Sequence, residues 1–317
     1  MSVSVIIVAY ESGAWLPRCL DTLRAQTVPH EVVLVDNASS DGAPQTAAMA
    51  DTAIRLVEAG ENLGFAGGNN LGAERAKGEW LALLNPDAFP EPDWLERLLQ
   101  AAEAHPDVDC FTSLQIAEDD GRLLDGAGDA LTLFGFPYRM GFRRTRPDRI
   151  AAGEVFAPCG AAMMIRTRTF RALGGFDARF FCYCEDMDLG WRLRLAGGRT
   201  RLVPNAVVHH VGSAMTGRGS AFSRRLGYRN RLWTFWKNAS PGLFRLMAAP
   251  HLIATLLMLT ADVARGRGGP AWQGLREGWR RRREFRAEAP RADSAPILRA
   301  MTWSPLKAIR RGLDVRV

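Results

Sequence analysis

The chain has few cysteines and no evident leader, and both shortages limit where the protein can act. Cysteine occupies only five scattered positions among 317 residues: Cys19, Cys110, Cys159, Cys182 and Cys184. The first residues lack the basic segment and long apolar core of a signal peptide. We therefore expect reduced thiols and a cytoplasmic protein. Cys182 and Cys184 lack the second pair that a zinc site of this spacing needs.

Two phosphate-binding fingerprints are also absent. The first predicted strand, residues 3–9, is followed by Tyr10-Glu11-Ser12-Gly13. This matches neither the P-loop pattern nor the Gly-x-Gly-x-x-Gly dinucleotide pattern, so kinases, ATPases and dehydrogenases are disfavoured. A glycine-rich stretch does occur later, at residues 64–68, where glycines would allow either close approach of a ligand or a flexible loop.

No hydrophobic run in the sequence is long enough to predict a membrane span. The most apolar segment, residues 243–264, is interrupted by Arg245, His251 and Asp262. The uninterrupted remainder falls short of the roughly 20 apolar residues that cross a bilayer.

Positive charge is concentrated in residues 265–317, which hold 13 Arg and 1 Lys against 5 acids, out of a net charge of +7. Trp272, Leu275, Trp279 and Phe285 recur among these arginines, which predicts an interfacial helix on anionic lipid. A solvated basic tail is the alternative. Binding of nucleic acid by the tail would be strongly salt-dependent, but we expect no nucleic-acid partner because no recognised module is present.

Short apolar segments alternate with helical patterns through the first 210 residues. The predicted strands are residues 3–9, 32–35, 53–57, 80–84 and 203–210. Such alternation predicts an α/β fold with a largely parallel sheet and right-handed crossovers. We place a catalytic domain at residues 1–240 and a helical extension at 241–317.

Polar side chains follow the predicted strands where each one ends. Asn85, Pro86 and Asp87 stop the most apolar strand, since proline cannot donate to a sheet ladder. In open α/β sheets this edge binds the ligand, although Asn, Pro and Asp are also ordinary turn residues. The other polar residues at predicted strand ends are Tyr10, Glu11, Asp36 and Asn62.

A second group of carboxylates lies at residues 185–188. Glu185 and Asp186 border an apolar segment, where burial would raise a carboxyl pKa and suit it to proton abstraction. Asp186 or Asp188 could instead cap a helix. The last predicted strand ends in His209 and His210, which could be ligands or a simple hydrogen-bonding pair.

The segment between these groups is irregular. Residues 126–146 are rich in Gly and Arg, and we expect a mobile excursion over the site, because long loops of this kind often serve as lids.

Taken together, these motifs resemble the inverting family 2 glycosyltransferases of GT-A fold, and within them the bacterial rhamnosyltransferase-like group. The likeness spans about residues 3–240. The matching stretches are residues 5–10, 35–42, 62–70, 84–87, 173–177, 185–192, 210–213, 229–230 and 237–238.

The resemblance implies a Rossmann-like mixed sheet with helices on both faces, followed by a membrane-associating helical extension. It also implies roles for individual residues. The family's metal-binding DxD motif has the form Asn85-x-Asp87 in this chain. Asp87 would therefore bind a divalent cation (Mg or Mn), together with His210; His209 is the less favoured second ligand. Asp186 would be the general base, Glu185 would support it or orient the acceptor, and Arg192 would contact a phosphate. The donor would be bound by Ala9, Tyr10, Glu11, Asp36, Asn62, Gly67, Asn69 and Asn85.

The reaction implied is single displacement with inversion, from a nucleotide-sugar donor to a hydroxyl of a glycan or lipid-linked acceptor. We expect it to serve bacterial cell-surface polysaccharide synthesis, on the inner face of the cell membrane, with rhamnose from a dTDP donor as the first expectation. The alternative, a sugar-1-phosphate nucleotidyltransferase, should carry a Gly-rich, Lys/Arg-bearing loop after the first strand, and Tyr10-Glu11-Ser12-Gly13 is not such a loop.

Overall fold

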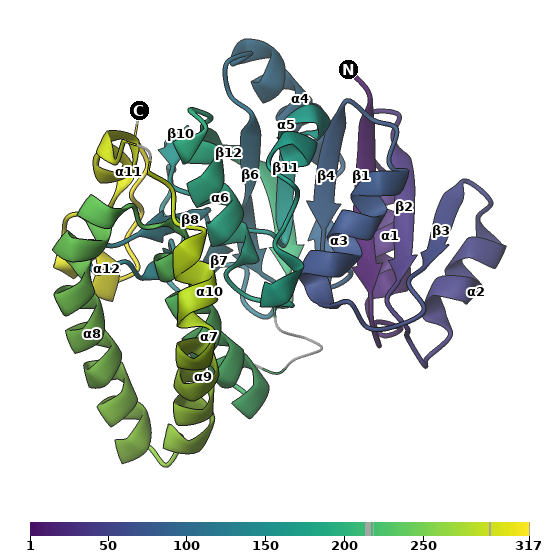
Figure 1. Cartoon of the computed structure of the whole chain (residues 1–317). Helices are drawn as coiled ribbons and strands as arrows, with labels where there is room; N and C mark the ends of the chain where they lie inside the picture. The colour runs from purple at the N-terminus through teal and green to yellow at the C-terminus, as the bar shows by residue number, and fades with distance from the viewer. Residues whose placement is uncertain (213–216, 218, 292, 317) are drawn as a thin grey trace.

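A computed structural model describes residues 1–212, 217, 219–291 and 293–316. Its centre is a sheet of order β10-β12-β6-β11-β4-β1-β2-β3, with β5 beside β12 and β7 beside β6 (Figure 1). The strands are β1 Val3–Ala9, β2 Glu31–Asp36, β3 Ile54–Glu58, β4 Trp80–Leu84, β5 Ala88–Pro90, β6 Cys110–Ala117, β7 Leu124–Gly126, β10 Gly153–Val155, β11 Ala162–Arg166 and β12 Thr200–His210.

Strand β4 lies in the middle of this sheet and every one of its residues is buried. It runs parallel to β1 on one side and antiparallel to β11 on the other. The expectation of a largely parallel sheet, drawn from strand and helix alternation alone, is therefore wrong at β11. The mixed sheet implied by the family resemblance is confirmed.

Helices cover both faces of the sheet (Figure 1). One apolar cluster includes Leu20 and Trp94, and a second, on the other face, includes Ala66, Phe170 and Leu189. The helices involved are α1 Leu16–Arg24, α2 Ala43–Ala50, α3 Gly64–Arg75, α4 Trp94–Ala104, α5 Thr167–Ala172, the 3₁₀ helix η1 Ala178–Phe180 and α6 Glu185–Leu195.

The glycine-rich stretch is the start of α3, and close packing explains its composition. A Cβ on Gly68 would lie 2.5 Å from Val8 Cγ1, and one on Gly72 would lie 2.5 Å from Ile6 Cγ2. Both contacts are too close for any side chain, so these glycines let α3 lie directly on β1. This settles the earlier choice between a flexible loop and a close-packed segment in favour of packing.

The segment expected to be a mobile excursion is a packed part of the body. It begins at the last residue of β7 and contains a small second sheet of β8 Asp129–Leu131 and β9 Pro137–Arg139. Leu124, Ala130 and Met140 are buried in a common cluster. The expectation of a mobile loop was wrong because these alternating apolar residues supply a core of their own.

The C-terminal helices lie against the sheet domain on the left side of Figure 1. Phe285 and Met301 share an apolar cluster with Trp191 and Trp233, and Arg316 pairs with Glu154 beside β10. The predicted boundary at residue 240 falls in the short turn between the first two of these helices and stays a prediction. They are α7 Ala221–Asn238, α8 Pro241–Ala264, α9 Gly268–Arg280, α10 Arg282–Ala287, α11 Ala295–Ala300 and α12 Pro305–Ile309.

Helix α8 corrects the sequence-based view of the apolar run. It is 24 residues long with Pro250 inside it, and by length and composition it could cross a membrane. The polar residues that seemed to interrupt the run do not end the helix, because His251 and Asp262 are buried against the protein.

Candidate active site

A cavity of about 780 Å³ opens where the strands end. Several separate parts of the chain form its walls: the ends of β1, β4 and β12, the start of α3, the β8–β9 hairpin, the segment that enters α6, and the start of α7. Among the lining residues are Tyr10, Asn62, Asn85, Asp87, Asp129, Arg139, Glu185, Asp186, His210, Ser223 and Arg311. Asp87 and Asp186, far apart in sequence, therefore face one cavity.

One wall, the strand-end wall, consists of Asp87, Asp125 and His210. All three are almost fully buried. The His210 Nδ1 atom lies 2.8 Å from Asp125 Oδ2, and its Nε2 atom lies 3.3 Å from Asp87 Oδ1. Burial lowers the pKa of His210, but Asp87 and Asp125 raise it on balance to about 9. The imidazole is thus an imidazolium that the two carboxylates hold in place.

This arrangement suits a cation as well as a proton. With Nδ1–H donated to Asp125, the imidazole would turn its Nε2 lone pair towards Asp87, and a metal ion could replace the proton there. Among the described residues, no group of three or more His, Cys, Asp or Glu could hold a metal ion. If an ion binds here, Asp87 and His210 would be its protein ligands, and substrate oxygens would complete the coordination.

The opposite wall, the α6 wall, consists of Asp129, Glu185 and Asp186. Asp186 accepts hydrogen bonds from Gly160 N at 3.0 Å and from Met187 N at 2.8 Å, which fix its carboxylate at the helix start. Burial, followed by repulsion from Asp186, raises the pKa of Glu185 well above its ordinary value and that of Asp129 to about 7. Glu185 Oε2 is buried without a hydrogen-bond partner among the described residues.

A strained turn delivers these carboxylates to the cavity. Phe181, Tyr183 and Cys184 all have positive φ, between 67° and 72°, a region that costs non-glycine residues about 1–3 kcal/mol each. The buried side-chain amide of Asn230 donates towards the carbonyls of Phe180, Cys182 and Tyr183 at 2.7–2.9 Å. Residue 230, part of a matching family stretch, therefore holds this turn.

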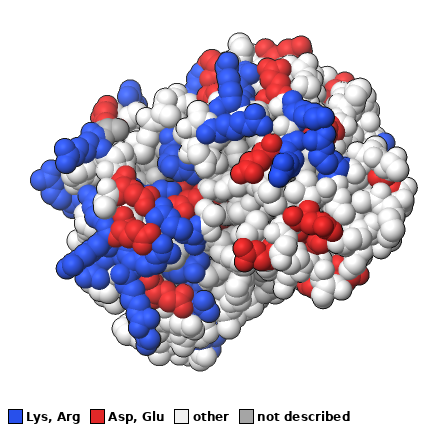
Figure 2. Space-filling view, turned by 45° about the vertical axis from the view of Figure 1, so that its right-hand side comes forward, with Lys and Arg blue, Asp and Glu red and all other residues white. Residues whose placement is uncertain are grey.

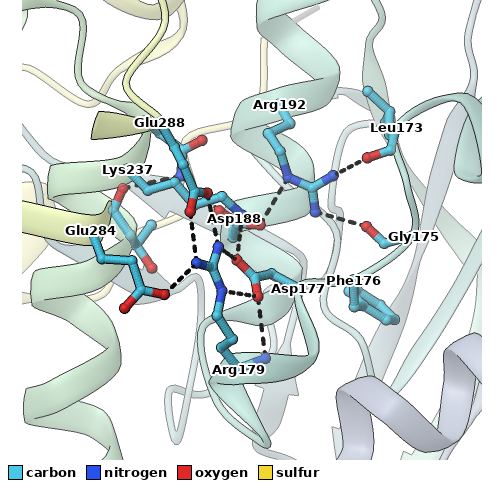
Figure 3. Close-up of polar contacts among 12 residues, drawn as sticks. Leu173, Gly175, Phe176, Asp177, Arg179, Asp188, Arg192, Lys237, Glu284 and Glu288 are labelled. Atoms are coloured by element: carbon cyan, nitrogen blue, oxygen red, sulfur yellow. Dashed lines mark hydrogen bonds and ion pairs between the residues drawn. The ribbon is translucent and has the colours of Figure 1, made fainter. Parts of the chain in front are cut away.

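Helix α6 is tied to its neighbours by a charged network on its other side (Figure 3). Asp188 accepts from Arg192 at 2.8 Å and from Lys237 at 3.1 Å, and also from Asn238 at 2.8 Å. Arg179 links this network to Glu284 and Glu288 of the C-terminal helices. The network fixes α6, and through it the α6 wall.

The same network corrects the role expected for Arg192. Its guanidinium donates to Asp188 and to the carbonyls of Leu173 and Gly175 (Figure 3). It does not line the cavity. Contact with a substrate phosphate is thus contradicted, because all its donors point into the protein.

The expected donor-binding residues divide into two groups. Tyr10, Asn62 and Asn85 line the cavity, whereas Ala9, Glu11, Asp36, Gly67 and Asn69 do not. Asp36 accepts from Ser39 N and Gln45 Nε2, and Glu11 accepts from Ser40. Asp36 and Glu11 thus fix the loop after β2, whereas Ala9 lies in β1 and Gly67 and Asn69 lie in α3.

His209 and His210 are separated by the alternation of strand β12. His210 enters the cavity, while His209 lies 3.4 Å from Glu91 on the opposite side of the strand. Ser213, the last residue of the matching stretch 210–213, lies outside the described residues.

Four functional candidates escaped the sequence analysis: Asn37, Asp125, Asp129 and Arg139. Arg139 links the two walls, with Nη1 3.1 Å from Asp125 and Nε 4.0 Å from Asp129. Asp129 and Arg139 lie in the segment expected to be a mobile loop, and Asp125 directly precedes it; no periodic pattern marked these three residues. Asn37, which donates to Asn62 at 3.0 Å, follows Asp36 at a strand end and could have been found by that position.

A model of the family described as Glycosyl transferase family 2 matches residues 4–174. The N-acetylglucosaminyl-diphospho-decaprenol L-rhamnosyltransferase of Mycobacterium tuberculosis is 32% identical over 268 residues, covering 76% of this chain and 86% of the relative. Rhamnosyltransferase WbbL of Escherichia coli is 26% identical, over 64% of this chain and 80% of the relative.

Two solved structures share the fold at low sequence identity. The mannosyltransferase PcManGT from Pyrobaculum calidifontis, in complex with GDP-Man and Mn²⁺, has a TM-score of 0.57 at 21% identity, covering 97% of this chain and 86% of that one. GalNAc-T7 with UDP, GalNAc and Mn²⁺ has a TM-score of 0.61 at 18% identity, and the match covers 76% of this chain and 48% of that one.

The chain belongs to glycosyl transferase family 2. It is an inverting glycosyltransferase with a GT-A fold, as the resemblance implied. A sugar-1-phosphate nucleotidyltransferase is accordingly set aside.

Proposed function

We propose that the protein transfers rhamnose from a nucleoside-diphosphate donor to a hydroxyl of a lipid-linked, sugar-bearing acceptor in cell-envelope polysaccharide synthesis. The observation that carries the proposal is the single cavity lined by both Asp87 and Asp186. The sugar and the acceptor class come from the names of the two rhamnosyltransferase relatives.

Asp87 and His210 would hold a divalent cation, Mg²⁺ or Mn²⁺. The donor set supports this, because an imidazole nitrogen oriented by Asp125 faces a buried carboxylate oxygen. When bound, such an ion neutralises charge on the diphosphate leaving group. Asn85, whose side-chain nitrogen lies 3.4 Å from His210 Nε2, would orient the imidazole or a phosphate oxygen.

On the opposite wall, Asp186 would accept the proton of the acceptor hydroxyl as that oxygen attacks the anomeric carbon. Its two backbone hydrogen bonds hold the carboxylate in one orientation, which favours a general base. Glu185, whose pKa burial and Asp186 raise well above its ordinary value, would donate a hydrogen bond to the acceptor when protonated. Attack from this side, opposite the diphosphate, inverts the configuration.

Tyr10, Asn37 and Asn62 line the remaining end of the cavity and would receive the nucleoside. Ala9, Glu11, Asp36, Gly67 and Asn69 would act from behind them by fixing the loops. For the location we propose the cytoplasmic face of an anionic membrane, where a lipid-linked acceptor would be within reach. Nucleic acid is not among the partners that we propose.

The test is an in vitro transfer assay with purified protein, Mn²⁺ and a panel of nucleotide sugars against an N-acetylglucosaminyl-diphospho-lipid acceptor. We expect dTDP-rhamnose to give product, with the anomeric configuration of the new linkage inverted relative to the donor by NMR. A different productive sugar would refute the rhamnose assignment alone. Retention of configuration would refute the mechanism.

A further inference from the structure

Helix α8 has the opposite polarity to a helix on the surface of a soluble protein. Six of its apolar side chains point outward and are 50–66% exposed: Leu246, Leu252, Ile253, Leu256, Leu257 and Val263. Its inward face includes His251, Thr255 and Asp262, which are at most 8% exposed. Surface helices normally bury the apolar stripe and expose the polar one, so the outward face of α8 is built for apolar surroundings.

The polar inward residues attach α8 to the protein along its length. His251 Nδ1 lies 2.9 Å from Phe134 O, and its ring stacks on Phe235 at 4.4 Å. Near the other end, Asp262 accepts from Arg224 at 2.6 Å and from Tyr228 at 3.0 Å. A helix held by its polar face at its middle and near its C-terminal end lies along a membrane surface more readily than it crosses the membrane.

An arginine-rich groove of about 460 Å³ begins at the first turn of α8. Trp236, Phe244 and Trp279 form its aromatic lining, with Arg282, Arg283 and Arg286 around them. The nearby acids Glu284 and Glu288 are bound to Arg179. Among the described residues, no ion pair engages Arg282 or Arg283. Figure 2 shows Lys and Arg crowded on the lobe formed by the C-terminal helices.

We propose that the outward face of α8 lies in the interfacial layer of an anionic bilayer, and that Arg282 and Arg283 bind the phosphates of its lipid headgroups. Apolar side chains beside exposed tryptophans and arginines are the combination that the interface favours. This differs from the surface expected from the sequence, because Phe285 is fully buried and Leu275 packs against the core.

The same attachment brings the bilayer close to the cavity. Arg224 and Tyr228, which hold Asp262, lie within one helical turn of Ser223 and Gly227, which line the cavity. The lipid-facing surface therefore extends to the acceptor side of the site. This part of the inference rests on the proposed lipid-linked acceptor, whereas the bilayer contact itself does not.

The test is co-sedimentation of the full chain with phosphatidylcholine vesicles, with and without phosphatidylglycerol. We expect binding that is strengthened by phosphatidylglycerol and weakened by salt. Replacing Ile253→Glu and Leu256→Glu together should lower partitioning ten- to a hundredfold, since each removes an apolar side chain that the bilayer would otherwise bury. Met49→Glu, at a 78% exposed residue of α2, is the matched control and should bind like the parent.

A second pair of variants separates charge from apolar contact. Arg282→Ala with Arg283→Ala should reduce binding to phosphatidylglycerol vesicles about twentyfold, at about fivefold per arginine. Arg75→Ala with Arg168→Ala removes equal charge from the sheet domain and should have little effect. Equal binding by the parent and both double variants would overturn the proposal.

Two controls keep this result separate from the transfer reaction. The vesicles contain neither donor nor acceptor, so the outcome is the same whichever sugar is transferred. Light scattering of the protein without lipid shows whether a second copy covers α8 instead. The proposal would also be overturned if the parent formed a dimer and did not bind vesicles, and if the double variant Ile253→Glu with Leu256→Glu dissociated that dimer.

Discussion

The two walls of the cavity both rest on carboxylates, but they balance charge in opposite ways. In the strand-end wall, Asp87 and Asp125 flank His210, whose pKa of about 9 makes it a cation. In the α6 wall, Asp129 lies 4.0 Å from Arg139, which also serves Asp125, and repulsion from Asp186 raises the pKa of both Asp129 and Glu185. The first wall is thus prepared to exchange a proton for a metal ion, and the second to keep protons on two carboxyl groups beside a third.

The largest effect should come from the α6 wall. We expect Asp186→Asn to lower kcat about 10²–10⁴-fold, because the amide cannot accept the acceptor proton. Donor binding should persist, and it is measured as the rise in Tm that nucleotide sugar and Mn²⁺ cause. Glu185→Gln keeps a hydrogen-bond donor and serves as the matched control with a smaller loss. Near-normal turnover by Asp186→Asn would assign the base elsewhere.

The strand-end wall should respond in metal affinity. Asp125→Asn weakens the hold on His210, so we expect the Mn²⁺ concentration for half-maximal activity to rise about 10–100-fold. At saturating Mn²⁺, kcat should largely recover, a result that simple unfolding would not give. An unchanged Mn²⁺ requirement would remove His210 from the proposed ligand set.

A pH series can show that the α6 wall keeps protons. The pKa of Asp129 is raised by burial and by Asp186 to about 7. The folded state therefore binds more protons than the unfolded chain, and stability from this group is lost as pH rises from about 4 to 7. Asp129→Asn should remove that loss, so the variant gains roughly 1–3 kcal/mol relative to the parent between pH 5 and pH 8. Urea unfolding of the parent and the variant at pH 5 and at pH 8 measures this gain. If the difference in free energy of unfolding between the two proteins were the same at both pH values, the raised pKa would be contradicted.

The smallest effect should come from outside both walls. Glu284 is one of three carboxylates on Arg179 and is 42% exposed at its side chain. We expect Glu284→Gln to lower the free energy of unfolding by less than about 1 kcal/mol and to leave kcat unchanged. Glu288→Gln should behave alike. A larger loss from either would mean that the network in Figure 3 transmits strain to the α6 wall.

Sequence patterns predicted the strand-end residues well, because strand period and a terminating proline are local signals. Strand β4 and the exit at Asn85–Asp87 follow from residues within one short segment. The antiparallel pairing of β11 with β4 and β6 does not follow from local residues, because it depends on residues that are far away in the sequence.

Side-chain direction was the second limit. Arg192 sits in a family motif beside the proposed base, yet one step around α6 turns it into the protein. Asp125 and Asp129 lie in an irregular segment, and only the fold brings them to His210 and Asp186. For α8, the pattern of polar residues within an apolar run suggested an interruption, because burial of His251 and Asp262 depends on α7 and on residue 134.

Arg311 closes the cavity from a part of the chain remote from every strand. A ribosome must therefore pass residue 311 before the pocket can be complete, long after the nucleoside end has emerged. Shortened chains that stop before that point should fold their sheet and yet remain open to solvent at the acceptor side.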